Sequence, residues 1–177
     1  TMEVAAEEVE RTTGELVGRM KARIVEGEKA GVSPVDVSDV DEQKATAKLL
    51  VESKADINQA SEGGCTPLYI ASQTGHTATV KLLVESKANI NQARVSGSTP
   101  LHIASQTGHV ATVKLLVESK AGINQANKDG VTPLYVAISD GHTATAKLLV
   151  ASKADINQAS EGGCTSLYTA RHTVQQA

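Results

Sequence analysis

Histidine is the residue of this chain whose chemistry is most often catalytic or metal-binding, and its copies are regularly spaced. His76, His109 and His142 follow one another at intervals of 33 residues, and His102 is the fourth residue of a Thr-Pro-Leu-His string. Imidazole at such positions could ligate a metal ion or act as a general base. A single histidine per repeating unit is instead typical of a structural hydrogen bond, so we expect neither a metal site nor a catalytic site here.

The two cysteines could offer a nucleophile or a disulfide. Cys65 and Cys164 stand at the same point of a repeated string, 99 residues apart, which predicts two structural thiols, buried or half-buried, rather than a disulfide. Cys65 is followed by His76, but the equivalent position after Cys164 is Gln175, which argues against a catalytic Cys-His pair. The sequence contains no zinc-protease, serine-hydrolase, phosphate-loop or paired Cys-x-x-Cys motif, and we expect no enzymatic activity and no cofactor.

The composition predicts a folded chain with an aliphatic core. Hydrophobic residues make up 40% of the sequence and aromatic residues only 2%, so Leu, Ile, Val and Ala must fill thin, closely spaced layers. A net charge of -3 gives no field that would attract nucleic acid or an anionic membrane. No run approaches 18 apolar residues and the N-terminus does not resemble a signal peptide. We expect a soluble intracellular protein with no nucleic-acid, membrane or small-molecule partner.

An internal repeat of 33 residues, without insertions, positions these side chains. Its copies begin with a Thr-Pro-Leu-Tyr, Thr-Pro-Leu-His or Thr-Ser-Leu-Tyr string at Thr66, Thr99, Thr132 and Thr165. Threonine followed by proline predicts the cap and first position of a short helix, and Gly75 and its copies predict a left-handed end. The "KLLVESKA" string has helical apolar spacing and predicts a second helix. One such pair cannot bury its apolar face alone, so neighbouring units must stack.

The repeat resembles a known family in several features at once. These are the 33-residue period, "TPLHIAS", the Gly-His between helices and "KADIN" or "KANIN" before the turn, and together they are similar to the ankyrin repeat. The resemblance implies an all-α solenoid of stacked helix-turn-helix units with β-turn fingers. The expected divisions are an N-terminal helical segment at 1–30, a degenerate repeat at 31–65, repeats at 66–98, 99–131 and 132–164, and a partial repeat, first helix only, at 165–177.

Both ends of the array depart from the intact units. Residues 1–30 are interpreted as a diverged capping unit, the alternative being a single unrelated amphipathic helix that oligomerises. "GVSPVDVSDVDE" at 31–42 aligns with 64–75, Ser33 and Pro34 meeting Thr66 and Pro67, which predicts a first helix rather than a linker. At 165–177 one helix of a unit predicts an exposed apolar face, unless this half-unit caps the array or the natural protein continues. If the chain is an excised part of a longer one, this end should fray or associate.

The resemblance implies protein recognition through the finger tips and the ends of the first helices, which line a concave surface in the family. The tips are also where otherwise copied units of this chain diverge, and Arg94, Lys128 and Asp129 are the side chains expected to contribute most. The candidate partner-binding residues are Glu62, Arg94, Val95, Ser96, Asn127, Lys128, Asp129, Ser139, Asp140 and Glu161. We expect a non-catalytic protein-binding scaffold. The alternatives are exposed loops that drift under little constraint, or a structural spacer or homo-oligomerising scaffold element, including a fragment of a larger protein.

One departure from the family recurs in every unit. Where the family usually has glycine after the second helix, this chain has Lys54, Lys87, Lys120 and Lys153. A left-handed lysine costs about 1 kcal/mol relative to glycine, so we expect a strained cap or an altered helix end. The lysines could also form a functional basic ridge, but a solvated face is expected because the net charge is negative.

Overall fold

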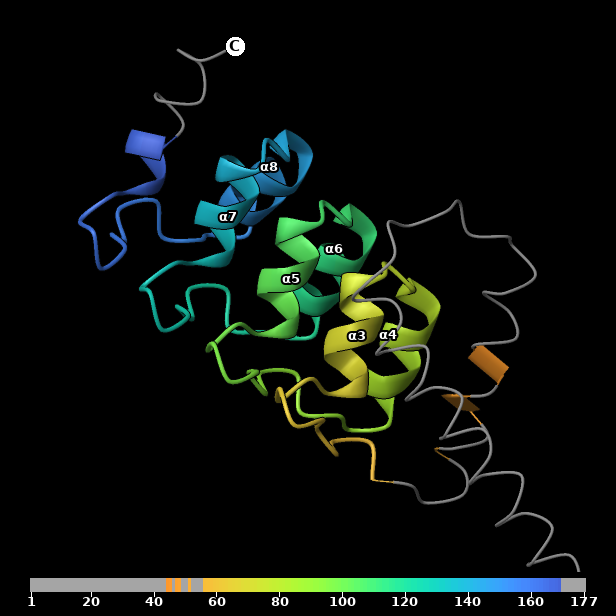
Figure 1. Cartoon of the computed structure of the whole chain (residues 1–177). Helices are drawn as coiled ribbons and strands as arrows, with labels where there is room; N and C mark the ends of the chain where they lie inside the picture. The colour runs from red at the N-terminus through yellow and green to blue at the C-terminus, as the bar shows by residue number, and fades with distance from the viewer. Residues whose placement is uncertain (1–43, 46, 49–50, 52–55, 170–177) are drawn as a thin grey trace, which may run out of the picture. The chain divides into compact units, whose positions relative to one another are not determined.

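The computed structural model describes residues 44–45, 47–48, 51 and 56–169, all within one compact unit, Gln43–Ala177. The predicted segments at 1–30 and 31–42 lie outside the described residues, as does 170–177. Three helix pairs follow one another (Figure 1): α3 (Pro67–Gln73) with α4 (Thr77–Glu85), α5 (Pro100–Gln106) with α6 (Val110–Glu118), and α7 (Pro133–Ser139) with α8 (Thr143–Ala151). Within the described part, the only strand-like pairing is an isolated bridge between Ala159 and Thr165.

The first helix of each pair begins and ends as the sequence predicts. In α5 the Oγ1 of Thr99 accepts from the backbone N–H of His102, and proline occupies the first turn. The same cap is present at Thr66 and Thr132. After α5 the chain reverses at Gly108, whose φ of 74° lies in the left-handed region that favours glycine. The predicted helix-turn-helix unit is therefore set by local signals that each copy carries.

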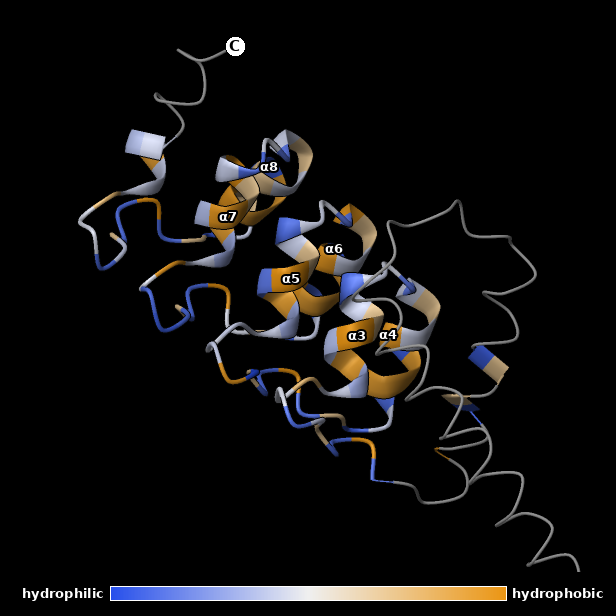
Figure 2. Ribbon diagram, viewed as in Figure 1, coloured by the Kyte–Doolittle hydropathy of each residue, from blue (hydrophilic) through white to orange (hydrophobic). Residues whose placement is uncertain are grey.

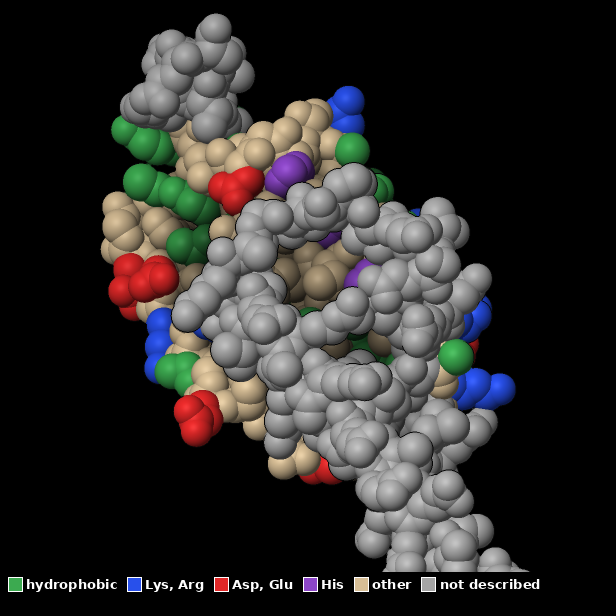
Figure 3. Space-filling view, turned by 45° about the vertical axis from the view of Figure 1, so that its right-hand side comes forward, with side chains coloured by type: hydrophobic (Ala, Val, Ile, Leu, Met, Phe, Trp, Pro, Cys, Tyr) green, Lys and Arg blue, Asp and Glu red, His purple; other side chains and the backbone are tan. Residues whose placement is uncertain are grey.

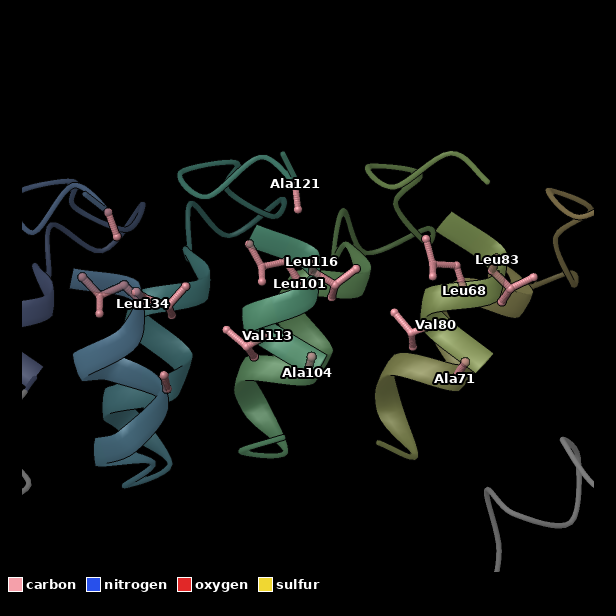
Figure 4. Close-up of a cluster of buried hydrophobic side chains, with 13 residues drawn as sticks. Leu68, Ala71, Val80, Leu83, Leu101, Ala104, Val113, Leu116, Ala121 and Leu134 are labelled. Atoms are coloured by element: carbon pink, nitrogen blue, oxygen red, sulfur yellow. The ribbon is translucent and has the colours of Figure 1, made fainter. Parts of the chain in front are cut away.

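The core lies between the helices of each pair and between successive pairs. First helices contact first helices and second helices contact second helices along the array. Figure 2 shows the apolar residues of the helices and the polar residues of the loops, and Figure 4 shows the aliphatic side chains that meet between helices. Leu68, Leu101 and Leu134, which occupy one position of the repeat, are each 1% exposed. The prediction of thin aliphatic layers is confirmed for these units.

The second helices end on a left-handed lysine. The φ angles of Lys87, Lys120 and Lys153 are 70°, 66° and 67°. Behind Lys120 the backbone N–H of Ala121 donates to the carbonyl of Leu116 at 2.9 Å, and the N–H of Lys120 donates to Val117 at 3.0 Å. These two bonds form a Schellman cap, with Ala121 buried against the core. Of the two outcomes expected, the strained cap is the one observed at Lys87, Lys120 and Lys153, while Lys54 lies outside the described residues.

Lys120→Gly is expected to raise the free energy of unfolding by about 1 kcal/mol, because glycine adopts the left-handed conformation without the Cβ clash. Lys114→Gly, in the interior of α6, should instead lower it by about 1 kcal/mol, since glycine is a poor residue for a helix interior. Urea denaturation followed by circular dichroism measures both changes. If both substitutions lowered the free energy of unfolding, the cap at Lys120 would be unstrained.

Candidate protein-binding surface

Each pair of helices is joined to the next by a closed finger. In the finger at 94–98 the backbone N–H of Arg94 donates to the carbonyl of Ser98 at 3.0 Å, and the N–H of Gly97 donates to the carbonyl of Arg94 at 2.8 Å. Gly97 has a φ of 84°, which closes the turn at little steric cost. The bonds repeat in the fingers that begin at Ser61, Asn127 and Ser160.

Successive fingers are bonded to one another through the backbone. The N–H of Val95 donates to the carbonyl of Gly63 at 3.2 Å. The same bond joins Lys128 to Ser96 at 3.1 Å and Glu161 to Asp129 at 3.0 Å. A Cβ added to Gly97 would lie 2.7 Å from the backbone nitrogen of Lys128, so the fingers touch. We call this row of four bonded tips, residues 61–64, 94–97, 127–130 and 160–163, the finger row.

The loops that follow the second helices carry a further ladder, which sequence reasoning missed. The side-chain oxygen of Asn58 accepts from the backbone N–H of Asn89 at 2.7 Å in the next unit. Asn91 accepts from Gly122 and Asn124 from Asp155 in the same way, each at 2.8 Å. An asparagine at one register of every copy was the available signal. These bonds and the finger bonds fix the spacing of the units.

Most of the predicted tip residues present their side chains to solvent. Val95 is 62% exposed. The exposed members of the candidate set are Glu62, Val95, Ser96, Lys128, Asp129 and Glu161 in the finger row, with Ser139 and Asp140 at the end of α7. Figure 3 shows acidic and basic side chains interspersed on this face of the described part. The tips therefore form a surface of mixed charge that includes one exposed apolar side chain, that of Val95.

Arg94 is held against the preceding unit. Its guanidinium carbon lies 5.6 Å from the ring centroid of Tyr69, and Nη1 donates to the Tyr69 hydroxyl at 3.5 Å. Tyr69 is itself only 2% exposed, so its ring packs within the repeat. A guanidinium stacked in this way contributes about 0.5–1 kcal/mol at a partly exposed site and loses little freedom on binding. Arg94 is thus an ordered, half-buried member of the surface.

Asn127 differs from the other candidate residues because its side chain shapes the finger. Its Oδ1 accepts from the backbone N–H of Asp129 at 3.0 Å and of Val131 at 2.9 Å. This is an Asx turn, in which the side chain mimics a backbone acceptor. The half-buried amide therefore holds Lys128 and Asp129 at the tip, which is a positioning role.

The histidines that invited a chemical interpretation make structural hydrogen bonds. His109 Nε2 donates to the carbonyl of Gln73 at 3.1 Å, and His142 Nε2 to the carbonyl of Gln106 at 2.8 Å, each across a unit boundary. The predicted structural role of both is confirmed. In the part of the chain that the structure describes, no three His, Cys, Asp or Glu residues are grouped to hold a metal ion. Cys65 and Cys164 are half-buried free thiols.

His102 is buried and its tautomer follows from its partners. The backbone N–H of Thr99 donates to Nδ1 at 3.1 Å, so Nδ1 is the acceptor. Nε2 then carries the proton and donates to the carbonyl of Val131 at 3.0 Å. Burial lowers the pKa of His102 below its ordinary value of 6.5, because the imidazolium would lose its hydration, while the bond to Val131 opposes this. The histidine is neutral and completes the cap of α5.

Acidification is expected to destabilise the array through His102. Between the lowered folded-state pKa and the unfolded value of 6.5 the unfolded chain binds more protons, so the free energy of unfolding falls as the pH drops through 6.5. His102→Tyr should reduce this fall, since Tyr69 and Tyr135 occupy the same position in the neighbouring units. Urea denaturation at pH 7.5, 6.5 and 5.5 measures the slope. An identical slope in the two proteins would exclude His102 as its source.

The outer face, formed by the second helices, carries a shallow groove between α4 and α6. Its volume is about 300 Å³, and its lining residues are Lys81, Val84, Glu85, Leu115, Glu118 and Ser119. Two solvent-exposed ion pairs, Lys81 to Glu85 and Lys114 to Glu118, span 3.9 Å each and contribute little to stability. None of the described helices combines the length and apolar character needed to cross a membrane.

Comparison with known proteins gives one family match. A family model described as "Ankyrin repeats (3 copies)" matches residues 38–127 and 91–160, which together cover more than half of the chain. The matched region contains all of the helices from α3 to α8. No curated protein matches the sequence.

Proposed function

Since this chain belongs to the ankyrin-repeat family, whose repeats are generally protein-protein interaction modules, we propose that it binds a protein partner across the finger row and the end of α7. The proposal is of a non-catalytic scaffold. Its binding side chains are those of Glu62, Val95, Ser96, Lys128, Asp129 and Glu161 in the finger row and of Ser139 and Asp140 at the end of α7, with Arg94 and Asn127 as ordered supports.

The observation that carries the proposal is a fixed backbone with variable side chains. The same inter-finger hydrogen bond occurs at three successive junctions, so the tips are held at constant spacing. The side chains on this constant frame change from Glu62 to Val95 to Lys128 and Asp129. A preordered surface loses little conformational entropy on binding. The surface fits a partner that offers charges of both signs around an apolar contact.

A charge exchange at the tip tests the proposal without altering the net charge. Lys128→Glu combined with Asp129→Lys should abolish chemical cross-linking to proteins that the wild type captures from a cell extract. The matched control is Lys114→Glu with Glu118→Lys on α6, where the two side chains are similarly exposed. We expect the control to capture the same proteins as the wild type. Equal capture by the tip variant would exclude the finger row as the binding surface.

A structural spacer or homo-oligomerising element is the second candidate function. It is favoured by the near identity of the copies, since residues 55–66 and 154–165 have the same sequence. A spacer needs stacked units but no distinct tip chemistry. Sedimentation velocity on the purified chain separates the two functions. Self-association that the tip exchange leaves unchanged, without capture of another protein, would favour the spacer.

A further inference from the structure

The two junctions between the described helix pairs differ on the side of the second helices. At the first junction, between α4 and α6, the hydroxyl oxygens of Thr77 and Thr112 lie 2.9 Å apart and share a hydrogen bond. At the second junction, between α6 and α8, Val110 and Thr145 occupy the same two positions of the repeat. Valine carries a methyl group where threonine carries a hydroxyl, so the bond cannot form at the second junction.

The replacement leaves a buried hydroxyl without a partner. Thr145 is 0% exposed, as is Thr112, and its Oγ1 has no hydrogen-bond partner among the described residues. A hydroxyl in this state has lost its hydration without compensation, which favours any arrangement that lets water reach it. Val110 is the first residue of α6 and is 37% exposed, so the position opposite Thr145 lies next to solvent. A small separation of α6 from α8 is therefore enough to hydrate Thr145.

The other polar contacts across the two junctions are matched. Each junction has one finger bond, one bond from a histidine Nε2 to a backbone carbonyl, and one bond from a backbone N–H to an asparagine. These are Val95 to Gly63, His109 to Gln73 and Gly122 to Asn91 at the first junction, and Lys128 to Ser96, His142 to Gln106 and Asp155 to Asn124 at the second. Because these bonds recur, they do not distinguish the junctions.

The side of the first helices is well connected at both junctions. Arg94 contacts Tyr69 across the first, and His102 Nε2 donates to the carbonyl of Val131 at 3.0 Å across the second. The contact between α5 and α7 is also more extensive than that between α6 and α8. The weakness of the second junction is thus confined to its second helices.

We propose that the contact between α6 and α8 is a hinge, at which these helices separate more readily than α4 and α6 do. The first helices α5 and α7 and the finger bond from Lys128 to Ser96 stay in place and form the pivot. The fingers at 94–97 and 127–130 lie on either side of the hinge, so its opening changes the angle between them. The hinge rests on Val110 and Thr145, and it exists whether or not the finger row binds a partner.

Spin labels at one register of the repeat compare the two junctions in the whole chain. Lys81→Cys with Lys114→Cys spans the first junction, and Lys114→Cys with Lys147→Cys spans the second. All three lysines are exposed on second helices, and the free thiols of Cys65 and Cys164 are removed by substitution with serine. Double electron-electron resonance should give one distance across the first junction. Across the second it should give an additional, longer distance from the open form.

Three substitutions connect the open form to the missing bond. Val110→Thr supplies the partner of Thr145 and should lower the ratio of open to closed molecules about fivefold, the effect of one neutral hydrogen bond. Thr145→Val keeps the shape of the side chain but removes the buried hydroxyl, and it should lower the ratio by about fivefold or more. Thr77→Val is the converse change, which should create an open population across the first junction by leaving Thr112 without its partner.

Val150→Thr is the matched control, because it makes the same change at an exposed valine of α8. It should leave both distance distributions unchanged. The measurement uses the purified chain without a partner, so the hinge and the proposed function are tested separately. Identical distributions for the two label pairs before further substitution would overturn the proposal. So would a longer distance that either Val110→Thr or Thr145→Val leaves unchanged, or a first junction that Thr77→Val does not open.

Discussion

Leu101→Ala is expected to lower the free energy of unfolding by about 2–5 kcal/mol. Leu101 is 1% exposed and packs in one cluster with Val113 and Leu116 of α6. The unit that contains it is held on both sides, by α3 and by α7, so the helices cannot collapse fully into the space that the missing methyl groups leave. A cavity in this central unit also weakens the stacking of both neighbours.

Leu167→Ala is the matched control, because it changes the same residue type at the same register of the repeat. Leu167 is 74% exposed, so its truncation should change the free energy of unfolding by no more than about 0.5 kcal/mol. Urea denaturation followed by circular dichroism gives both values, and amide hydrogen exchange shows which units open. A difference below about 1 kcal/mol between the two variants would contradict the burial of Leu101.

The helix pairs could be predicted because their signals are local. The hydroxyl of Thr99 caps a helix that begins one residue later, and Gly108 ends the turn that follows it. Each signal acts within one unit and recurs at the next, so the period itself supports the interpretation. The left-handed Lys120 could be expected on the same basis, since glycine is the residue that the family usually has there.

The contacts between units could not be predicted in detail, because they need the stacking register. Arg94 reaches Tyr69 over 25 residues, and the side chain of Asn58 accepts a backbone N–H 31 residues later. Almost every residue has a backbone N–H, so the sequence identifies the asparagine that accepts the hydrogen bond but not the residue that donates it. The same holds for His109, whose partner is the carbonyl of Gln73.

The binding surface was only partly visible in the sequence. Divergence between copies identified the tips, but it did not separate Asn127, which shapes its own finger, from Lys128 and Asp129, which are exposed. Side-chain bonds within a finger depend on turn geometry rather than on residue type alone. The chemistry of a partner is a property of another molecule, so the tips give its charge pattern and not its identity.

Gly108→Ala is expected to lower the free energy of unfolding by about 2–3 kcal/mol. Its φ of 74° costs a residue with a Cβ about 1–2 kcal/mol. The added Cβ would also lie 2.5 Å from Nδ1 of His142, which real side chains do not tolerate. The imidazole must therefore move, and its 2.8 Å hydrogen bond to the carbonyl of Gln106, worth about 1 kcal/mol, is lost.

Gly141→Ala separates the strain from the clash, since Gly141 has a φ of 77° and an added Cβ there meets nothing within 4 Å. Gly141→Ala should lower the free energy of unfolding only by the backbone strain, about 1–2 kcal/mol. In a His142→Ala background the clash at Gly108 is absent, so both glycine substitutions should cost the same, as a double-mutant cycle in urea would show. If Gly108→Ala remained the costlier change without the imidazole, His142 would not be the group that requires glycine at 108, and the histidine would serve only its hydrogen bond to Gln106.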